Sequence, residues 1–265
     1  MRILPSVLLI VCVQTSIMAQ SNANNNSLNT INRLLTENSL YKANMTAQDY
    51  NAAGMFFYNR RSWTEAELMF SMAVKTDKNH VLACYNLTCV WSIQLNQFNN
   101  DRQKYNEVLE EDIGTPVVFG YLSRAITLDP ARGIRARQDA DFDNLRKYDP
   151  ILFDTVTLPE DQREIYRYDV TYVDFVVFEG NINCIFAEIG YENNRDRRLW
   201  IDGRDAKLRD KNLYYRENEW DWSGNKEMFG KRFIIEYIYE PRGSEFVGGN
   251  GLFKQIKVVS IKEKT

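Results

Sequence analysis

Between residues 47 and 80 the chain sets small and aromatic residues in a fixed order. Small residues let two helices approach closely, and aromatic rings fill the wedge between one pair of helices and the next. The spacing therefore describes a scaffold of packed helices. The residues in this order are Tyr50, Gly54, Phe57, Ala66, Phe70 and Ala73.

This order resembles that of the tetratricopeptide repeat, a helical hairpin that stacks on its neighbours. A second stretch resembles the repeat too, with residues 81–92 as its first helix, residues 117–128 as its second, and Asp129 and Pro130 at its closing positions. The resemblance implies a scaffold that binds a partner, because such repeats present a concave groove. It does not name the partner.

The second repeat carries an insertion of roughly 18 residues compared with a regular repeat. It covers residues 96–115 and is rich in Asn, Glu and Asp. Such an insertion is either a lid over the binding face or padding on the surface. We favour padding, because surface loops lengthen at little entropic cost.

The segment after the second hairpin resembles the closing stretch of many bacterial tetratricopeptide proteins. Its aspartates Asp139, Asp141 and Asp143 alternate as the first ligands of a calcium loop do. That loop requires glycine at its sixth position and glutamate at its twelfth, where this chain has Asn144 and Pro150. The sequence therefore predicts a polar cap at the end of the array and no metal site.

The register of the repeat also implies which residues form the groove. They lie on one side of the first helix of each hairpin, and we predict that this side contacts a protein or peptide partner. The predicted partner-binding residues are Asn51, Met55, Tyr58 and Asn59 in the first repeat and Tyr85, Cys89 and Ser92 in the second.

The pattern changes after Pro159. Tyr166, Tyr168, Val170 and Tyr172 alternate with polar residues, as in a half-buried strand. Further strands are expected over residues 182–189, 198–201, 212–216, 232–239 and 253–261. We predict an α+β chain with a signal peptide at 1–19, a flexible start and lead-in helix at 20–46, a helical domain at 47–154 and a β domain at 155–265.

Residues 230–237 and 253–261 resemble the closing hairpin of OB-like β-barrels appended to exported bacterial proteins. This resemblance implies a small antiparallel β-barrel. A β-sandwich satisfies the same alternation and remains an alternative.

Tryptophans are the candidate ligand-binding residues of the β domain: Trp200, Trp220 and Trp222. Exposed tryptophans beside carboxylates can stack on sugar rings or anchor a peptide. They can also plug the end of a barrel, and we favour the plug.

The N-terminus has the features of a signal peptide, with Met1 and Arg2 before an apolar run at 3–13 and Ala19 at the predicted cut. The run is too short for a stable membrane anchor. We therefore expect an exported protein, periplasmic or secreted.

Export leaves three cysteines, Cys84, Cys89 and Cys184, which we expect to be buried and unbridged. Thiol catalysis needs a base, and the only histidine, His80, is predicted to lie in a turn. No catalytic residue and no cofactor is therefore expected.

Net charge is −3, which gives no general attraction to nucleic acid. Two functions remain open. We favour a non-enzymatic adaptor that binds a protein or peptide partner in the groove, and the alternative is an envelope glycan or cell-wall binding protein that uses the β domain.

Overall fold

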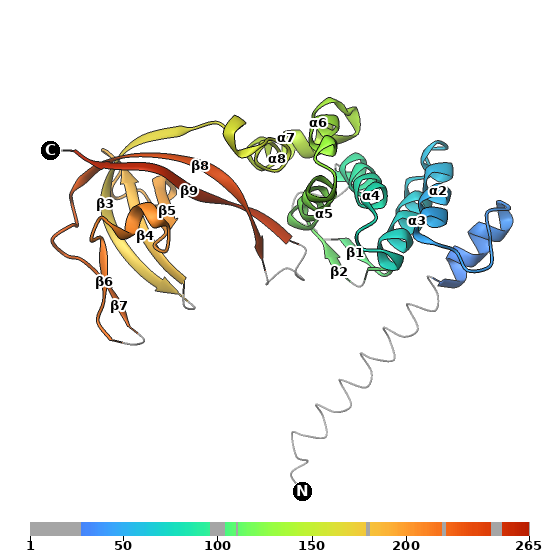
Figure 1. Cartoon of the computed structure of the whole chain (residues 1–265), viewed down its shortest axis with the longest axis horizontal. Helices are drawn as coiled ribbons and strands as arrows, with labels where there is room; N and C mark the ends of the chain where they lie inside the picture. Colours follow the sequence, from blue (N-terminus) through green and yellow to red (C-terminus); the bar gives the residue numbers. More distant parts are fainter. Residues whose placement is uncertain are drawn as a thin grey trace, which may run out of the picture. The chain divides into compact units, whose positions relative to one another are not determined.

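The computed structural model of the chain describes residues 28–95, 104–109, 111–178, 181–218, 221–244 and 251–264 (Figure 1). The chain divides into two compact units, one of Met1–Thr157 with Gly243–Leu252 and one of Leu158–Arg242 with Phe253–Thr265. The first is helical apart from a small hairpin and the end of another, and the second is built on an antiparallel sheet. This confirms the predicted α+β class. The predicted signal peptide lies outside the described residues.

Successive helices form the first unit. A helix over residues 28–37 buries Ile31 and Leu35 in the helical core. It is followed by α2 (Ala47–Tyr58), α3 (Trp63–Thr76), α4 (Val81–Gln94) and α5 (Thr115–Leu128), each packed against the next. None of the described helices is long and apolar enough to cross a bilayer.

Local sequence fixes where these helices begin. Thr46 and Asp49 form a capping box at the start of α2, because each side chain accepts a hydrogen bond from the other's backbone N–H. His80, predicted to lie in a turn, is the N-cap of α4 and accepts the backbone N–H of Ala83 on Nδ1 at 3.1 Å.

Gly54 sets the distance between α2 and α3. A Cβ atom built on it would lie 2.4 Å from two ring carbons of Phe70, which is fully buried. No side chain fits there without displacing that ring, so the two helices approach as closely as they do because residue 54 is glycine.

The insertion at 96–115 is described in part. Its strands β1 (Lys104–Asn106) and β2 (Glu111–Ile113) pair antiparallel. Asn106 is buried and donates to Glu67 Oε1 and Ser71 Oγ of α3, both at 3.1 Å. The interpretation as padding is wrong for this part, since Val108 and Ile113 belong to the helical core.

The polar cap is a chain of short helices: α6 (Ala131–Gln138), η2 (Ala140–Phe142), α7 (Asp143–Tyr148) and α8 (Pro150–Thr157). Phe142 anchors it, because its buried ring packs edge-on against Tyr85 of α4. The polar cap therefore packs against α4.

The second unit holds a five-stranded sheet in the order β5-β4-β3-β8-β9. Register places apolar residues opposite one another on its inner face, for example Val170 against Phe233 and Cys184 against Ile201. Tyr172 is fully buried there and donates its hydroxyl to the carbonyl of Leu213 at 2.9 Å. The strands are β3 (Tyr166–Phe178), β4 (Asn181–Glu188), β5 (Arg198–Asp202), β8 (Arg232–Ser244) and β9 (Gly251–Glu263).

The sheet is not closed into a barrel, because β5 and β9 remain its two edges. Side chains link the segment after β5 to β9 instead. Asp205, just after β5, accepts the backbone N–H of Val258 on β9 at 2.9 Å, and Leu208 of α9 (Ala206–Arg209) is buried in the core between them. The segment after β5 is therefore linked to β9 by a side-chain hydrogen bond and not by a backbone ladder.

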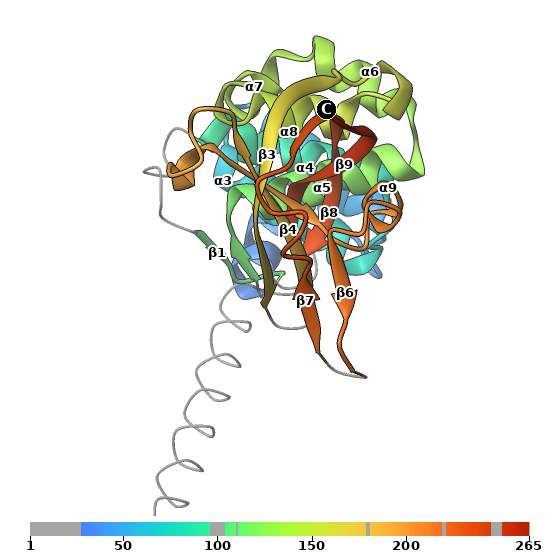
Figure 2. The ribbon, with the colours of Figure 1, turned by 90° about the vertical axis from the view of Figure 1, so that its left-hand side faces the viewer.

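Strands β6 (Tyr214–Arg216) and β7 (Trp222–Gly224) form a separate hairpin that extends beyond the five-stranded sheet (Figures 1 and 2). The sequence predicts β6 within 212–216 but gives no sign of β7 or of α9. Strand β7 and helix α9 are too short to show a repeating pattern.

Candidate functional site

A pocket of about 520 Å³ opens on the helical unit. Three segments of the chain line it. On α2 and on α4 most of the lining residues are three, four or seven positions apart, which places them on one side of a helix. The lining residues are Asn51, Met55 and Tyr58 of α2, Leu82, Tyr85, Asn86 and Cys89 of α4, and Arg132, Arg135, Asp139 and Asp141 of the cap.

Most of the predicted partner-binding residues meet here, namely Asn51, Met55, Tyr58, Tyr85 and Cys89. Two do not. Asn59 is the exposed C-cap of α2 and does not line the pocket. Ser92 is fully buried, and its Oγ accepts the backbone N–H of Leu145 at 3.3 Å. It fixes α7 to α4, so its predicted role in binding is wrong.

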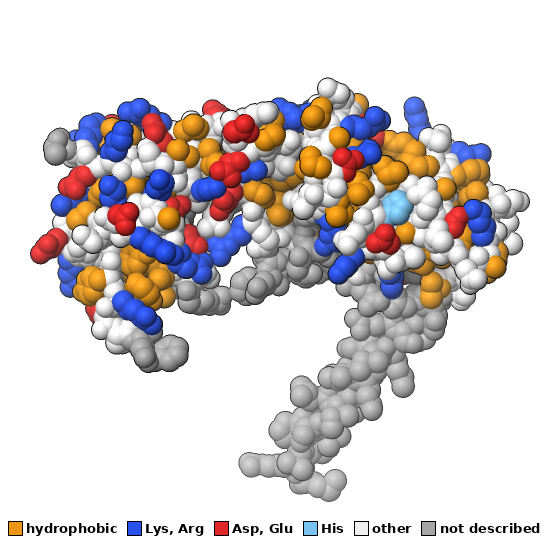
Figure 3. Space-filling model, viewed as in Figure 1, with side chains coloured by type: hydrophobic (Ala, Val, Ile, Leu, Met, Phe, Trp, Pro, Cys, Tyr) orange, Lys and Arg blue, Asp and Glu red, His pale blue; other side chains and the backbone are white. Residues whose placement is uncertain are grey.

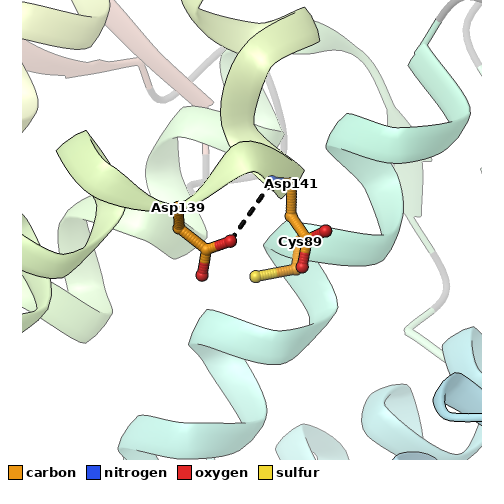
Figure 4. A group of neighbouring side chains, drawn as sticks. All are labelled: Cys89, Asp139 and Asp141. Atoms are coloured by element: carbon orange, nitrogen blue, oxygen red, sulfur yellow. Dashed lines mark hydrogen bonds between the residues drawn. The ribbon is translucent and has the colours of Figure 1, made fainter.

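Two aspartates of the cap form the polar wall of the pocket. Asp139 accepts the hydroxyl of Tyr85 on Oδ2 at 3.1 Å and the backbone N–H of Asp141 on Oδ1 at 3.2 Å. Asp141 accepts the hydroxyl of Tyr58. Figure 4 shows both carboxylates next to the sulfur of Cys89. The hydrogen bonds hold each carboxylate in one orientation.

Burial controls the acidity of this group. It raises the pKa of Asp141, and the neighbouring Asp139 adds to the rise although the bond from Tyr58 opposes it. Burial also raises the pKa of the Tyr58 and Tyr85 hydroxyls and, by a large margin, that of the Cys89 thiol. The tyrosines and the cysteine are therefore neutral at pH 7.

An amide pair forms a second polar element. Asn86 Nδ2 donates to Asn51 Oδ1 at 3.0 Å. Asn51 is 4% exposed, and its own Nδ2 has no hydrogen-bond partner among the described residues. Asn86 Oδ1 likewise accepts no hydrogen bond from a described residue. The pair therefore offers one donor and one acceptor to the pocket.

Two arginines of α6 also line the pocket. Arg132 is paired with Asp129 at 2.9 Å and lies 5.6 Å from the centre of the Tyr85 ring. Arg135 is exposed, and its guanidinium has no hydrogen bond or ion pair within the part of the chain that the structure describes. On the face shown in Figure 3, acidic and basic side chains intermix while apolar ones gather over the helical unit.

Cys89, Asp139 and Asp141 are also the described residues that could together hold a metal ion, since their ligand atoms lie within 4.8 Å of one another. The donor set fits a divalent cation poorly. Sulfur must be deprotonated to bind metal, and burial opposes that step at Cys89.

The two candidate tryptophans that the structure describes lie on different strands. Trp200 is 52% exposed on the edge strand β5, opposite Ile185 of β4. Trp222 is half-buried on β7, where its ring packs edge-on against Tyr214. Trp200 is too exposed to plug the sheet, so the favoured interpretation is wrong for it. Trp220 lies outside the described residues.

The cysteine prediction is confirmed: Cys84, Cys89 and Cys184 are free and buried. Sequence reasoning assigned no binding role to Leu82, Asn86, Arg132, Arg135, Asp139 or Asp141. Leu82 and Asn86 could have been found from helical spacing, because they share a face with Tyr85 and Cys89. The cap residues could not, because the sequence does not show that the cap folds back on α4.

Comparison of the chain with protein families, with curated proteins and with solved structures finds no match.

Proposed function

We propose that the protein is an exported, non-enzymatic adaptor of the tetratricopeptide type, which binds a protein or peptide partner in the pocket between α2, α4 and the cap. The observation that carries this proposal is the convergence of three chain segments on one hollow whose polar groups keep unused bonding capacity. A volume of about 520 Å³ is in the range of small-ligand and side-chain pockets.

The repeat assignment is supported by the packing of α2, α3, α4 and α5 in chain order and by the contact of Gly54 with Phe70. Binding in the pocket also agrees with the groove side that the repeat register implies. For the sheet unit, an OB-like origin is supported by β8 and β9 being neighbours in the sheet.

A binding role for the tyrosine and cysteine side chains of the pocket is supported by their protonation. A nucleophile or general base must lose its proton near neutral pH. Burial raises the pKa of Tyr58, Tyr85 and Cys89, so each keeps its proton. The two hydroxyls donate to Asp141 and Asp139 and so hold the carboxylates of the pocket in place.

The second candidate, glycan binding by the sheet unit, is favoured by one observation. Trp200 presents a large apolar surface to solvent on an edge strand. Such a ring can stack on a sugar. The pocket has more polar groups in defined orientations, and for that reason we place the binding function there.

The two candidates are separated by blocking each site in turn. Leu82 is 37% exposed at the pocket, and Leu82→Arg should fill the pocket without disturbing the core. Leu128→Arg is the matched control, since Leu128 is 42% exposed at the end of α5 and does not line the pocket. Partners are isolated from envelope extract with the wild-type protein, purified, and titrated against each variant.

We expect Leu82→Arg to weaken binding by about thirtyfold or more, the effect of losing one anchor of about 2 kcal/mol. Leu128→Arg and Trp200→Ala should leave the dissociation constant unchanged. Equal binding by Leu82→Arg, together with loss of a glycan ligand in Trp200→Ala, would reject the adaptor in favour of the glycan binder.

A further inference from the structure

We propose that the pocket receives the cationic side chain of a lysine or arginine of the partner peptide, held between the carboxylates of Asp139 and Asp141. This inference rests on the proposed function of the pocket. It names the chemistry of the residue that the partner inserts.

The first observation is a contrast among the acids of the cap. Asp129 is paired with Arg132, and Asp143 with Arg146. Asp139 and Asp141, which face the pocket, form no ion pair with any described residue. Two half-buried carboxylates side by side repel each other, and a cation bound between them would relieve that repulsion.

The second observation is the orientation of these carboxylates. Tyr85 and Tyr58 each hold one aspartate, and the N–H of Asp141 holds Asp139 as well. A carboxylate oxygen can accept more than one hydrogen bond, so both groups keep acceptor capacity for an incoming N–H. Because they are already fixed, little entropy is lost when a cation binds.

The shape of the pocket suits the stem of a long basic side chain. Met55 and the partly exposed Leu82 supply apolar surface to the pocket. Lysine and arginine carry apolar methylene groups that pack on such surface while the charged end reaches a polar partner. A short cation without a stem would leave this surface uncovered.

An independent observation points to a peptide ligand. Asn51 is buried to all but 4% of its surface, yet its Nδ2 has no partner within the described part of the chain. This Nδ2 group is accessible at the pocket wall, so a carbonyl oxygen of the bound peptide can accept its N–H. The free Oδ1 of Asn86 can accept an N–H of the same peptide.

Arg135 restricts which basic peptides fit. It lines the same pocket and brings a positive charge to the rim. A run of basic residues would place like charges together, whereas one basic residue beside an acidic residue would meet both the aspartates and Arg135. The pocket therefore selects a single basic anchor.

The experiment uses the full chain and a phage-displayed library of random peptides. Enriched peptides are synthesised, and each is compared with a version in which its basic residue is glutamine. Binding is measured on the wild type, on Asp139→Asn with Asp141→Asn, and on Asp143→Asn, an exposed acid of the same cap that does not line the pocket. Asparagine keeps an acceptor for the tyrosines and can still cap η2, so the fold should survive.

We expect one lysine or arginine at a shared position, a tenfold or greater loss on its change to glutamine, and a similar loss in the double variant. The glutamine peptide should bind the wild type and the double variant equally, and Asp143→Asn should bind as the wild type does. Binding should be unchanged by EDTA, because no metal takes part.

Peptides that lack a shared basic residue, ignore the double variant and yet are lost with Leu82→Arg would overturn this inference while the proposed function stands. Loss of binding on adding EDTA would overturn it in favour of a metal site. If no enriched peptide depends on Leu82, both the inference and the proposed function fail.

Discussion

Replacing Gly54 by alanine tests the closest helix contact of the first unit. Two effects oppose each other. Alanine is a better helix former than glycine by about 1 kcal/mol. Against this, the new methyl group would lie 2.4 Å from the ring of Phe70, which is fully buried.

Overpacking a dense core costs about 1–3 kcal/mol, and a contact this short belongs at the upper end of that range. After the gain in helix propensity is subtracted, we expect Gly54→Ala to lower the free energy of unfolding by roughly 1–2 kcal/mol. The measurement is urea unfolding followed by circular dichroism at the helical band.

A control variant in the same helix measures the effect of helix propensity without the packing effect. Ala52 is exposed on α2, so Ala52→Gly should cost only the propensity difference, about 1 kcal/mol. A second variant, Phe70→Leu, removes the ring, and in that background Gly54→Ala should be neutral or stabilising. If Gly54→Ala instead stabilised the wild type by as much as Ala52→Gly destabilises it, the close packing of α2 on α3 would be refuted.

Four further outcomes are expected. Limited proteolysis should cut at 158–165, where exposed residues join the two units, and should spare α8; cleavage within α8 would contradict this. Asn106→Ala should lower the free energy of unfolding by about 1–3 kcal/mol, because Glu67 and Ser71 lose a buried partner; an unchanged urea midpoint would show that the insertion is padding after all. Cys84, Cys89 and Cys184 should resist iodoacetamide in the native protein and react after unfolding, because each is buried and burial raises the pKa of Cys84 to about 11 and of Cys184 to about 12. Mass spectrometry measures how many of these thiols are alkylated, and alkylation of any of them in the native protein would contradict this. The pKa of Asp141 in the folded protein is raised above 3.8, so this carboxyl stabilises the fold fully below pH 3.8, and the stabilisation is lost as pH rises through the folded pKa. Asp141→Asn should remove this contribution to the pH dependence of the free energy of unfolding. Parallel curves of unfolding free energy against pH for the wild type and the variant would refute the expectation.

The sequence was most informative where a pattern repeats over many residues. The small and aromatic order at 47–80 located α2 and α3, and tyrosine alternation located β3, because both patterns follow from which side of an element is buried. Short elements such as α9 and β7 span too few residues to show a period. The open sheet was missed because closure depends on side chains such as Asp205, which no strand pattern reveals.

The residues of the pocket also fall into two groups, those that the sequence predicts and those that it does not. Asn51, Met55 and Tyr58 could be placed on one face from the helical register alone. Asp139 and Asp141 reach the pocket only because Phe142 docks the cap against Tyr85, a contact between residues far apart in the sequence. The same docking buries Ser92, which is why the register gave it the wrong role.

The most direct test of binding in the pocket is to map, by NMR, the backbone amides of the full chain that shift when an enriched peptide binds. Binding in the pocket predicts shifts concentrated in residues 51–58, 82–89 and 132–141, with the largest at Asn51, Asn86 and Asp141. Shifts confined to β5 and the hairpin of β6 and β7, with the helical unit silent, would contradict it and place the binding function on the sheet.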